Sequence, residues 1–241
     1  MSAMAIGRGK LLGTAAAVAM AMSLVPIGNA QAAVSQCKIT SYTPNKLVVG
    51  ASDVKLTIKP KITNCTNPRW GFATDALPDD SAASQEPTIT VTPRTMLNMD
   101  AGKKEAYFAV TGDEDTTADP RTVRTTFQLL RRSTFGSTLN ATPEPVKKGN
   151  KITIRATLAR VSWDGASNGK YVGFPQAKAK LQFKANGTTA YKNVKWVTAA
   201  AGGKFATTVK ADRSGRYRLV FAGISTTAPA TSTSDAIVVR N

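Results

Sequence analysis

The side chains that usually carry out acid–base chemistry are scarce in this 241-residue sequence. Histidine is absent, which removes the commonest general base and the commonest zinc ligand. Residues 165–169 read G-A-S-N-G and match the G-x-S-x-G nucleophile motif. That motif needs a strand-turn-helix elbow and a histidine partner, and residues 165–169 are expected in a loop. No carboxylates stand in a motif for glycoside hydrolysis. The sequence therefore predicts a protein that is not an enzyme.

One dense acidic cluster has the chemistry of a cation site. It consists of Asp113, Glu114, Asp115 and Asp119, and carboxylate oxygens in a loop are the ligands that calcium prefers. The spacing differs from that of an EF-hand, because the acids do not alternate around a central glycine and Pro120 ends the loop. A solvated turn between strands is the alternative. Calcium is thus the one cofactor that the sequence suggests, and the leading interpretation includes no cofactor.

Basic side chains are concentrated in the second half of the chain. Residues 33–137 hold 13 basic and 11 acidic groups, a net charge of +2, whereas residues 138–241 hold 17 and 4, a net charge of +13. We expect an anion-binding surface on the outer faces of this half. A solvated surface that aids solubility and blocks edge pairing is the alternative. The candidate anion-binding residues alternate with apolar positions: Lys151, Arg155, Lys180, Lys184, Lys195, Arg216 and Arg218.

Aromatic residues of the second half fall into two groups. Those of the first group alternate with polar residues and are assigned to the core, so nucleic acid, whose bases stack on exposed rings, is not expected as a partner. Trp163, Tyr171 and Phe174 lie near a loop instead, where exposed rings can dock sugars or proteins. Capping one end of the core is the alternative for these three. The first group comprises Phe183, Trp196, Phe205, Tyr217 and Phe221.

Residues 1–32 have the organisation of a secretory signal peptide. Arg8 and Lys10 give a positive start, and residues 11–25 form an apolar run too short to span a bilayer comfortably. The small-x-small pattern at residues 30–32 fits a signal peptidase. A retained membrane anchor is the alternative. No later stretch approaches the length of a spanning helix, so we expect no membrane span and a secreted, extracellular product.

The two cysteines are expected to pair with each other. Cys37 and Cys65 are the only cysteines of an exported chain, and the compartment outside the cytoplasm is oxidising. Two free thiols are the alternative. With 27 residues between them, the link should stabilise the fold by about 3 kcal/mol on the chain-entropy model.

Period-two alternation dominates the chain beyond residue 33, and no amphipathic helical window of useful length appears. Two prolines within residues 140–145 mark a seam, so we predict an N-terminal domain over 33–137 and a C-terminal domain over 138–241. Residues 67–87 are rich in Pro, Asp, Ser and Ala and are predicted to be a long loop around Trp70 and Phe72. Strands are predicted near 46–50, 54–58, 88–91, 106–110, 123–129, 137–141, 152–158, 180–184, 193–196, 205–209, 217–221 and 236–239.

Several ordered segments of the C-terminal half carry a resemblance: ATPEPVKKG at 141–149, RVSW at 160–163, KYVGF at 170–174, LQFK at 181–184 and GRYR at 215–218. Together they resemble a family of secreted actinobacterial proteins built from immunoglobulin-like repeats. The resemblance implies export and a β-sandwich fold, with no established activity. Some members are labelled calcium-binding, and no residues here carry a motif for that label.

These observations predict an all-β protein, with two tandem immunoglobulin-like β-sandwich domains after a cleaved signal peptide. The predicted function is non-catalytic association with anionic cell-envelope or extracellular matrix components, with an envelope polymer or polysaccharide, or another extracellular protein, as partner. A calcium-binding extracellular module is one alternative. A secreted enzyme inhibitor, or an accessory protein of a glycan-acting enzyme, is another. The sequence carries no signal for the oligomeric state.

Overall fold

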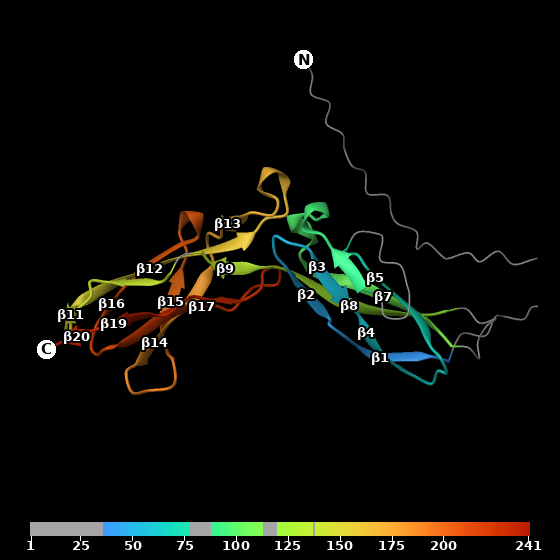
Figure 1. Cartoon of the computed structure of the whole chain (residues 1–241), viewed down its shortest axis with the longest axis horizontal. Coiled ribbons are helices and arrows are strands. Elements are labelled where there is room, and N and C mark those ends of the chain that lie inside the picture. Colours follow the sequence, from blue (N-terminus) through green and yellow to red (C-terminus); the bar gives the residue numbers. More distant parts are fainter. Residues whose placement is uncertain (1–35, 78–87, 113–119, 137) are drawn as a thin grey trace, which may run out of the picture. The chain divides into compact units, whose positions relative to one another are not determined.

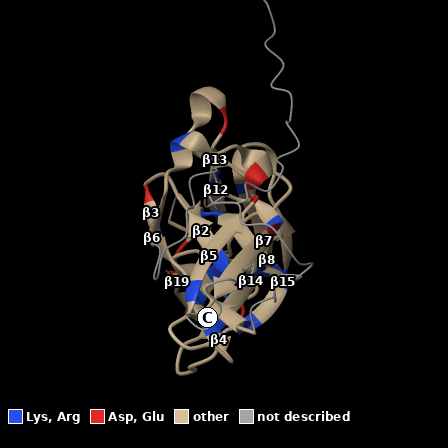
Figure 2. Ribbon diagram, turned by 90° about the vertical axis from the view of Figure 1, so that its right-hand side faces the viewer, with Lys and Arg blue, Asp and Glu red and all other residues tan. Residues whose placement is uncertain are grey.

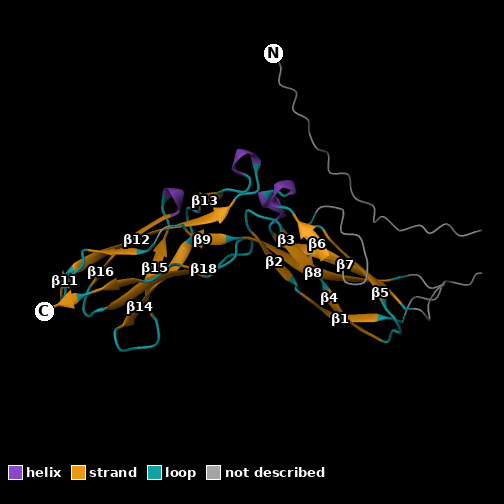
Figure 3. Ribbon diagram, viewed as in Figure 1, coloured by secondary structure: helices purple, strands orange, loops and turns teal. Residues whose placement is uncertain are grey.

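Alternation of apolar and polar residues makes the regular structure of the described residues almost entirely β-strand (Figures 1 and 3). The computed structural model describes residues 36–77, 88–112, 120–136 and 138–241, all within one compact unit. The predicted signal peptide and the acidic residues Asp113, Glu114, Asp115 and Asp119 lie outside the described residues. Helical structure in the described ranges consists of short 3-10 turns: η1 (Pro93–Thr95), η2 (Asn98–Asp100), η4 (Gly165–Ser167) and η5 (Ala201–Gly203).

A first hydrophobic core lies between a four-stranded sheet and two strand pairs. The sheet has the order β2-β8-β7-β5, in which β2 is parallel to β8 and the other pairs are antiparallel. The antiparallel pairs β1–β4 and β3–β6 supply Ile39, Leu56 and Val91 to the same core. The strands are β1 (Lys38–Thr43), β2 (Lys46–Val49), β3 (Val54–Thr57), β4 (Lys59–Thr63), β5 (Arg69–Thr74), β6 (Thr88–Val91), β7 (Gly102–Thr111) and β8 (Arg121–Arg131).

Aromatic rings form the centre of this core. The fully buried Phe108 of β7 has the rings of Tyr42 and Phe72 at centroid distances of 4.9 and 5.0 Å, and that of Trp70 at 6.2 Å. The prediction of a long loop over 67–87 was wrong for its first part, because residues 69–74 form β5 and pair with β7. The alternation of Trp70 and Phe72 with small or polar neighbours determines this strand despite the nearby Pro and Asp residues.

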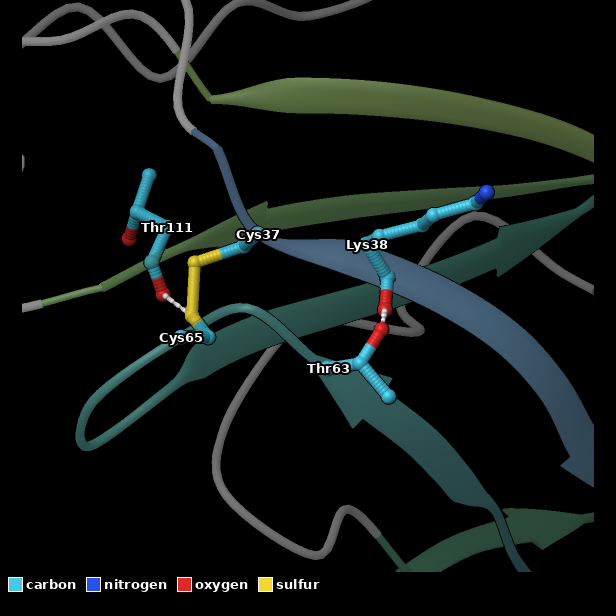
Figure 4. Close-up of a disulfide and its surroundings, with 5 residues drawn as sticks. All are labelled: Cys37, Lys38, Thr63, Cys65 and Thr111. Atoms are coloured by element: carbon cyan, nitrogen blue, oxygen red, sulfur yellow. Dashed lines mark hydrogen bonds between the residues drawn. A yellow bond between two sulfur atoms is a disulfide. The ribbon is translucent and has the colours of Figure 1, made fainter.

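The predicted disulfide between Cys37 and Cys65 is confirmed (Figure 4). Cys37 directly precedes β1 and Cys65 follows β4, and the pairing of Lys38 with Thr63 brings the two Cα atoms within 4.7 Å. The hydroxyl of Thr63 donates a hydrogen bond to the carbonyl of Lys38 beside the disulfide. The disulfide therefore links the start of β1 to the end of β4, two strands that are already hydrogen-bonded to each other.

A second hydrophobic core lies between two sheets of the C-terminal part. β12 pairs with β9, β10, β13 and β16, and β14 lies between β15 and β17 in the opposite sheet. Both sheets contribute buried residues, among them Ile152, Ile154, Leu181 and Leu219. The strands are β9 (Ser133–Phe135), β10 (Asn140–Thr142), β11 (Val146–Lys147), β12 (Lys151–Val161), β13 (Tyr171–Gly173), β14 (Lys178–Ala185), β15 (Lys192–Thr198), β16 (Lys204–Lys210), β17 (Gly215–Phe221), β18 (Ala230–Thr231), β19 (Asp235–Ile237) and β20 (Val239–Arg240).

The end of β12 leaves the second core and joins the first. Val161 and Trp163 are fully buried among residues of the first core, although both follow the predicted boundary at residue 137 in sequence. The sequence predicts that Trp163 is either an exposed ring near a loop or a cap at one end of the C-terminal core. Both predictions are wrong, because the ring is buried in the first core. The domain ranges 33–137 and 138–241 themselves stay a prediction.

Asn98 organises the polar groups around Trp163. Its side-chain oxygen accepts hydrogen bonds from Arg131 and from the backbone N–H of Trp163, at 2.5 and 3.0 Å. Its side-chain nitrogen donates to a carboxylate oxygen of Asp164 at 2.6 Å, and its backbone N–H donates to the other at 2.8 Å. One amide thus satisfies several partly buried groups, which would otherwise lose their hydrogen bonds to water without replacement.

Arg160 lies near Arg131 and connects this region to the second core. Burial lowers the pKa of Arg160 to about 10, and the neighbouring charge of Arg131 adds to the effect. The guanidinium donates to the hydroxyl of Thr227 and lies 3.9 Å from the centre of the Phe174 ring. These contacts fix the position of Phe174, whose ring also meets Phe221 edge-on.

Replacing both cysteines by serine should lower the free energy of unfolding by about 3 kcal/mol, because the unfolded chain has a higher conformational entropy without the cross-link. Urea unfolding followed by circular dichroism measures this change. The wild-type protein in reductant is the control and should unfold at the same urea concentration as the Cys37→Ser/Cys65→Ser variant. An unchanged midpoint in the double variant would contradict the stabilising role of the disulfide.

Asn98→Ala should destabilise the fold by about 2 to 3 kcal/mol, because it leaves the buried Arg131 and the backbone of Trp163 without their acceptor. The neighbouring Met99, 63% exposed, provides the control, and Met99→Ala should change stability by less than about 0.5 kcal/mol. Chemical denaturation of both variants makes the comparison. Equal losses at the two positions would show that Asn98 has no special role.

Candidate anion-binding face

The outer surface of the sheet β15-β14-β17 gathers basic side chains. On β14 the buried Ala179 and Leu181 alternate with positions that point away from the core. Lys184 pairs with Arg216 of β17, and Gln182 pairs with Arg218, so these four side chains share that outer surface. We define the basic face as the outward-pointing cations of this sheet: Lys178, Lys180, Lys184, Arg216 and Arg218.

No acidic side chain balances these charges within the three strands. The described residues of β14, β15 and β17 include seven lysines and arginines and no Asp or Glu. Figure 2 colours the basic positions of the ribbon blue and the acidic positions red. Asp235 of β19 belongs to the same sheet, but it lies opposite the inward-facing Tyr217 and accepts a hydrogen bond from the backbone N–H of Ala141. The basic face therefore has an uncompensated positive charge, the electrostatic condition for attracting a polyanion.

Two cations of the basic face are held in place by polar and aromatic partners. Arg218 donates to the side-chain oxygen of Gln182 at 2.8 Å, and Gln182 donates in turn to Asn193 at 2.9 Å. The guanidinium of Arg218 stacks on the Tyr191 ring at 3.8 Å, and the ammonium of Lys184 lies 5.3 Å from the same ring. Both charges are thus pre-organised and lose little side-chain freedom on meeting a ligand.

Trp196 lies on this outer surface, contrary to its predicted place in the core. β15 pairs Val197 with Ala179 and Trp196 with Lys180, so Val197 is buried and the indole is 57% exposed. The sequence placed Val194 and Trp196 inward, but Val197 and Ala199 set the inward phase instead. An irregularity in the pairing near Leu181 brings Asn193 opposite Gln182, leaving Val194 exposed. The Lys180 ammonium lies 5.0 Å from the Trp196 ring centre.

A pocket of about 650 Å³ opens beside Trp196. Its walls come from the turn after β13, the first residue of β14, the end of β15 and the turn after β17. Trp196 and Lys178 belong both to the pocket and to the outer surface of the sheet. The side chains that give the pocket its character are Phe174, Gln176, Lys178, Trp196, Phe221 and Ile224.

The seven predicted anion-binding residues do not form one surface. Lys180, Lys184, Arg216 and Arg218 lie together on the basic face. Lys151 and Arg155 lie on β12, in the opposite sheet. Lys195 pairs with the inward-facing Leu181, and its ammonium reaches the carbonyl of Thr208 on β16 at 2.8 Å. Lys178 was missed, although it continues the alternation of Lys180 and Lys184 along β14.

The remaining predicted chemistry is distributed elsewhere. Tyr171 is exposed, whereas Phe174 is partly buried and packs against the second core.

The G-x-S-x-G segment forms the 3-10 turn η4 and leads into β13, so it lacks the strand-turn-helix elbow of a nucleophile. Within the described residues no group of three potential metal ligands occurs. The calcium prediction on Asp113, Glu114, Asp115 and Asp119 stays a prediction, because these residues are not described.

None of the short helical turns in the described ranges has the length and apolar character of a membrane-spanning segment.

Comparisons with known proteins found similar solved structures but no family. No family model matches the sequence, and no curated protein matches it. The fibronectin(III)-like modules of Clostridium thermocellum CbhA are 12% identical, with 84% of this chain and 92% of that chain covered and a TM-score of 0.33. A chimeric titin tandem is 18% identical, with 81% of this chain and 94% of that chain covered and a TM-score of 0.30. The FN1–FN3 domains of chicken CNTN1 are 10% identical, with 84% of this chain and 64% of that chain covered and a TM-score of 0.34.

The sheets and cores described above define the class of this protein as all-β, with tandem immunoglobulin-like sandwiches, as predicted. The structural likenesses carry no information about its ligand.

The exposure of Trp196 beside cations makes a spectroscopic prediction. Iodide should quench tryptophan fluorescence more efficiently than caesium at low ionic strength, because the basic face attracts the anion and repels the cation. Trp163 is fully buried and Trp70 partly buried, so Trp196→Phe should remove most of this difference. Equal quenching by the two ions, or an unchanged difference in Trp196→Phe, would show that the indole does not lie on this face.

Proposed function

We propose that this chain is a secreted, non-catalytic protein whose C-terminal sandwich binds an anionic polymer of the cell envelope or extracellular matrix through the basic face. The observation that carries the proposal is the array of five outward cations on strands that contain no carboxylate. A polymer with a repeated negative charge contacts such an array at several points at once, so the weak individual attractions accumulate.

The arrangement favours an extended partner over a single small anion. The cations lie in rows across β14 and β17, with Lys184 opposite Arg216 and Gln182 opposite Arg218. Surface charges of this kind accelerate association and bind in a salt-dependent manner. A polymer lying along the sheet meets these requirements.

Two further observations support the proposed location and the absence of catalysis. The Cys37–Cys65 disulfide is typical of proteins that leave the reducing cytoplasm. The sequence contains no histidine, and the serine of the G-x-S-x-G segment lies in a 3-10 turn. Secretion also agrees with the signal peptide that residues 1–32 predict.

The test measures binding of the mature chain to inorganic polyphosphate, a polyanion without sugars, over a range of salt concentrations. The variant Lys180→Gln/Lys184→Gln/Arg216→Gln removes three charges from the basic face. It should bind at least about tenfold more weakly at low salt and show a shallower dependence on salt, because fewer counterions are displaced. Wild-type affinity should fall steeply as salt rises.

The matched control removes three exposed charges from the opposite sheet, as Lys151→Gln/Arg155→Gln/Lys210→Gln. Both triple variants have the same net charge, so a difference between them isolates the basic face. The control should lose less than about threefold in affinity. Equal losses would assign binding to overall charge, and salt-independent binding by the wild type would contradict the electrostatic mechanism.

A further inference from the structure

We infer that the pocket beside Trp196 binds a sugar unit of an anionic polysaccharide, whose charged groups lie on the basic face. This inference rests on the proposed function and adds the chemical class of the polymer. It depends on the fact that an exposed indole, an apolar pocket and a row of cations are continuous on one surface.

The pocket has the composition of a carbohydrate site. Its volume of about 650 Å³ falls within the range of roughly 300 to 1,000 Å³ that is typical of small-molecule sites. One face of a pyranose ring presents C–H groups, which pack against an aromatic ring, while its hydroxyl groups need polar partners. Trp196 and Phe174 supply aromatic surface, and the exposed Gln176 and Lys178 supply hydrogen-bonding groups at the rim.

The pocket walls are fixed before any ligand arrives. The centre of the Phe174 ring lies 3.9 Å from the guanidinium of Arg160 and 5.8 Å from the centre of the Phe221 ring, which it meets edge-on. The backbone N–H of Gln176 donates to the carbonyl of Ala199, which holds this residue at a φ of +63°, a value uncommon for a residue other than glycine. Rigid walls reduce the entropy lost on binding.

Charge and position connect the pocket to the polymer. Lys178 belongs both to the pocket and to the basic face. Lys180 lies on the same strand as Lys178, and its ammonium is 5.0 Å from the centre of the Trp196 ring. A sugar placed against Trp196 therefore has cations within reach on neighbouring strands. A uronic acid chain, with one carboxylate on each sugar, matches this combination of ring contact and repeated charge.

The same observations disfavour single-stranded nucleic acid. Base stacking along a strand requires successive open rings. Apart from Trp196, the ring beside the basic face is that of Tyr191, and its own neighbours Arg218 and Lys184 already contact it. One open indole next to an apolar pocket suits a single sugar better than a run of bases.

The experiment compares three probes on the mature chain: polygalacturonate, inorganic polyphosphate and oligothymidylate. Trp196→Ala should weaken polygalacturonate binding about tenfold, the effect typical of a central aromatic contact, and polyphosphate binding by less than about twofold. Trp196→Phe, which keeps a ring, should lose less than Trp196→Ala. Met99→Ala removes an equally exposed apolar side chain from the N-terminal half and should bind like the wild type.

Each other outcome separates the sugar inference from the proposed function. If Trp196→Ala weakens polygalacturonate and polyphosphate equally, or weakens neither, the sugar inference is wrong while polyanion binding stands. If oligothymidylate binds more tightly than polygalacturonate and depends on Trp196, the ligand is a nucleic acid and the sugar inference is again wrong. If the wild type binds no probe at low salt, the proposed function fails as well.

Discussion

The pairing register between β14 and β15 is the constraint on which the candidate site depends. Ala179 pairs with Val197, and this places both side chains in the core. The next pair, Lys180 and Trp196, must then point outward, because successive side chains of a strand alternate between its two faces. A slip of one residue would bury the indole and expose Val197, and the pocket would lose its aromatic wall. Core packing of two small apolar residues thus determines what the outer face offers to a ligand.

Packing in the second core also determines which side chains of β14 and β17 form the basic face. Phe183 and Tyr217 pair across β14 and β17 with ring centroids 4.6 Å apart, and burial raises the pKa of the Tyr217 hydroxyl. Their neighbours Lys184 and Arg216 therefore point away from the core on adjacent strands. The basic face is a consequence of this alternation, since each inward aromatic or aliphatic residue leaves an outward position between itself and the next.

The sequence predicted much of the architecture because strand periodicity is a local signal. Alternation of Ile152, Ile154 and Leu158 with polar residues marks β12 unambiguously, and two cysteines leave a single intramolecular pairing. The errors arose where two signals compete. β15 has apolar residues in both phases, and only its pairing with β14 decides between Trp196 and Val197. Trp163 is distant in sequence from the first core, so no local pattern could place it there.

The candidate site was predictable only in part for the same reason. Lys180, Lys184, Arg216 and Arg218 share a phase, which the sequence shows, and a sheet, which the strand pairing adds. Lys151 and Arg155 share that phase but belong to the opposite sheet, which depends on strand order and not on alternation. The pocket beside Trp196 combines turns after β13 and β17, whose proximity follows from the tertiary fold alone.

Mapping backbone amide chemical shifts during titration with polygalacturonate tests the central claim most directly. Binding at the proposed site predicts that the largest changes fall on residues 174–184, 192–198 and 215–224, which hold the basic face and the pocket. Changes concentrated on β12 and β16, or in the N-terminal core, would contradict it.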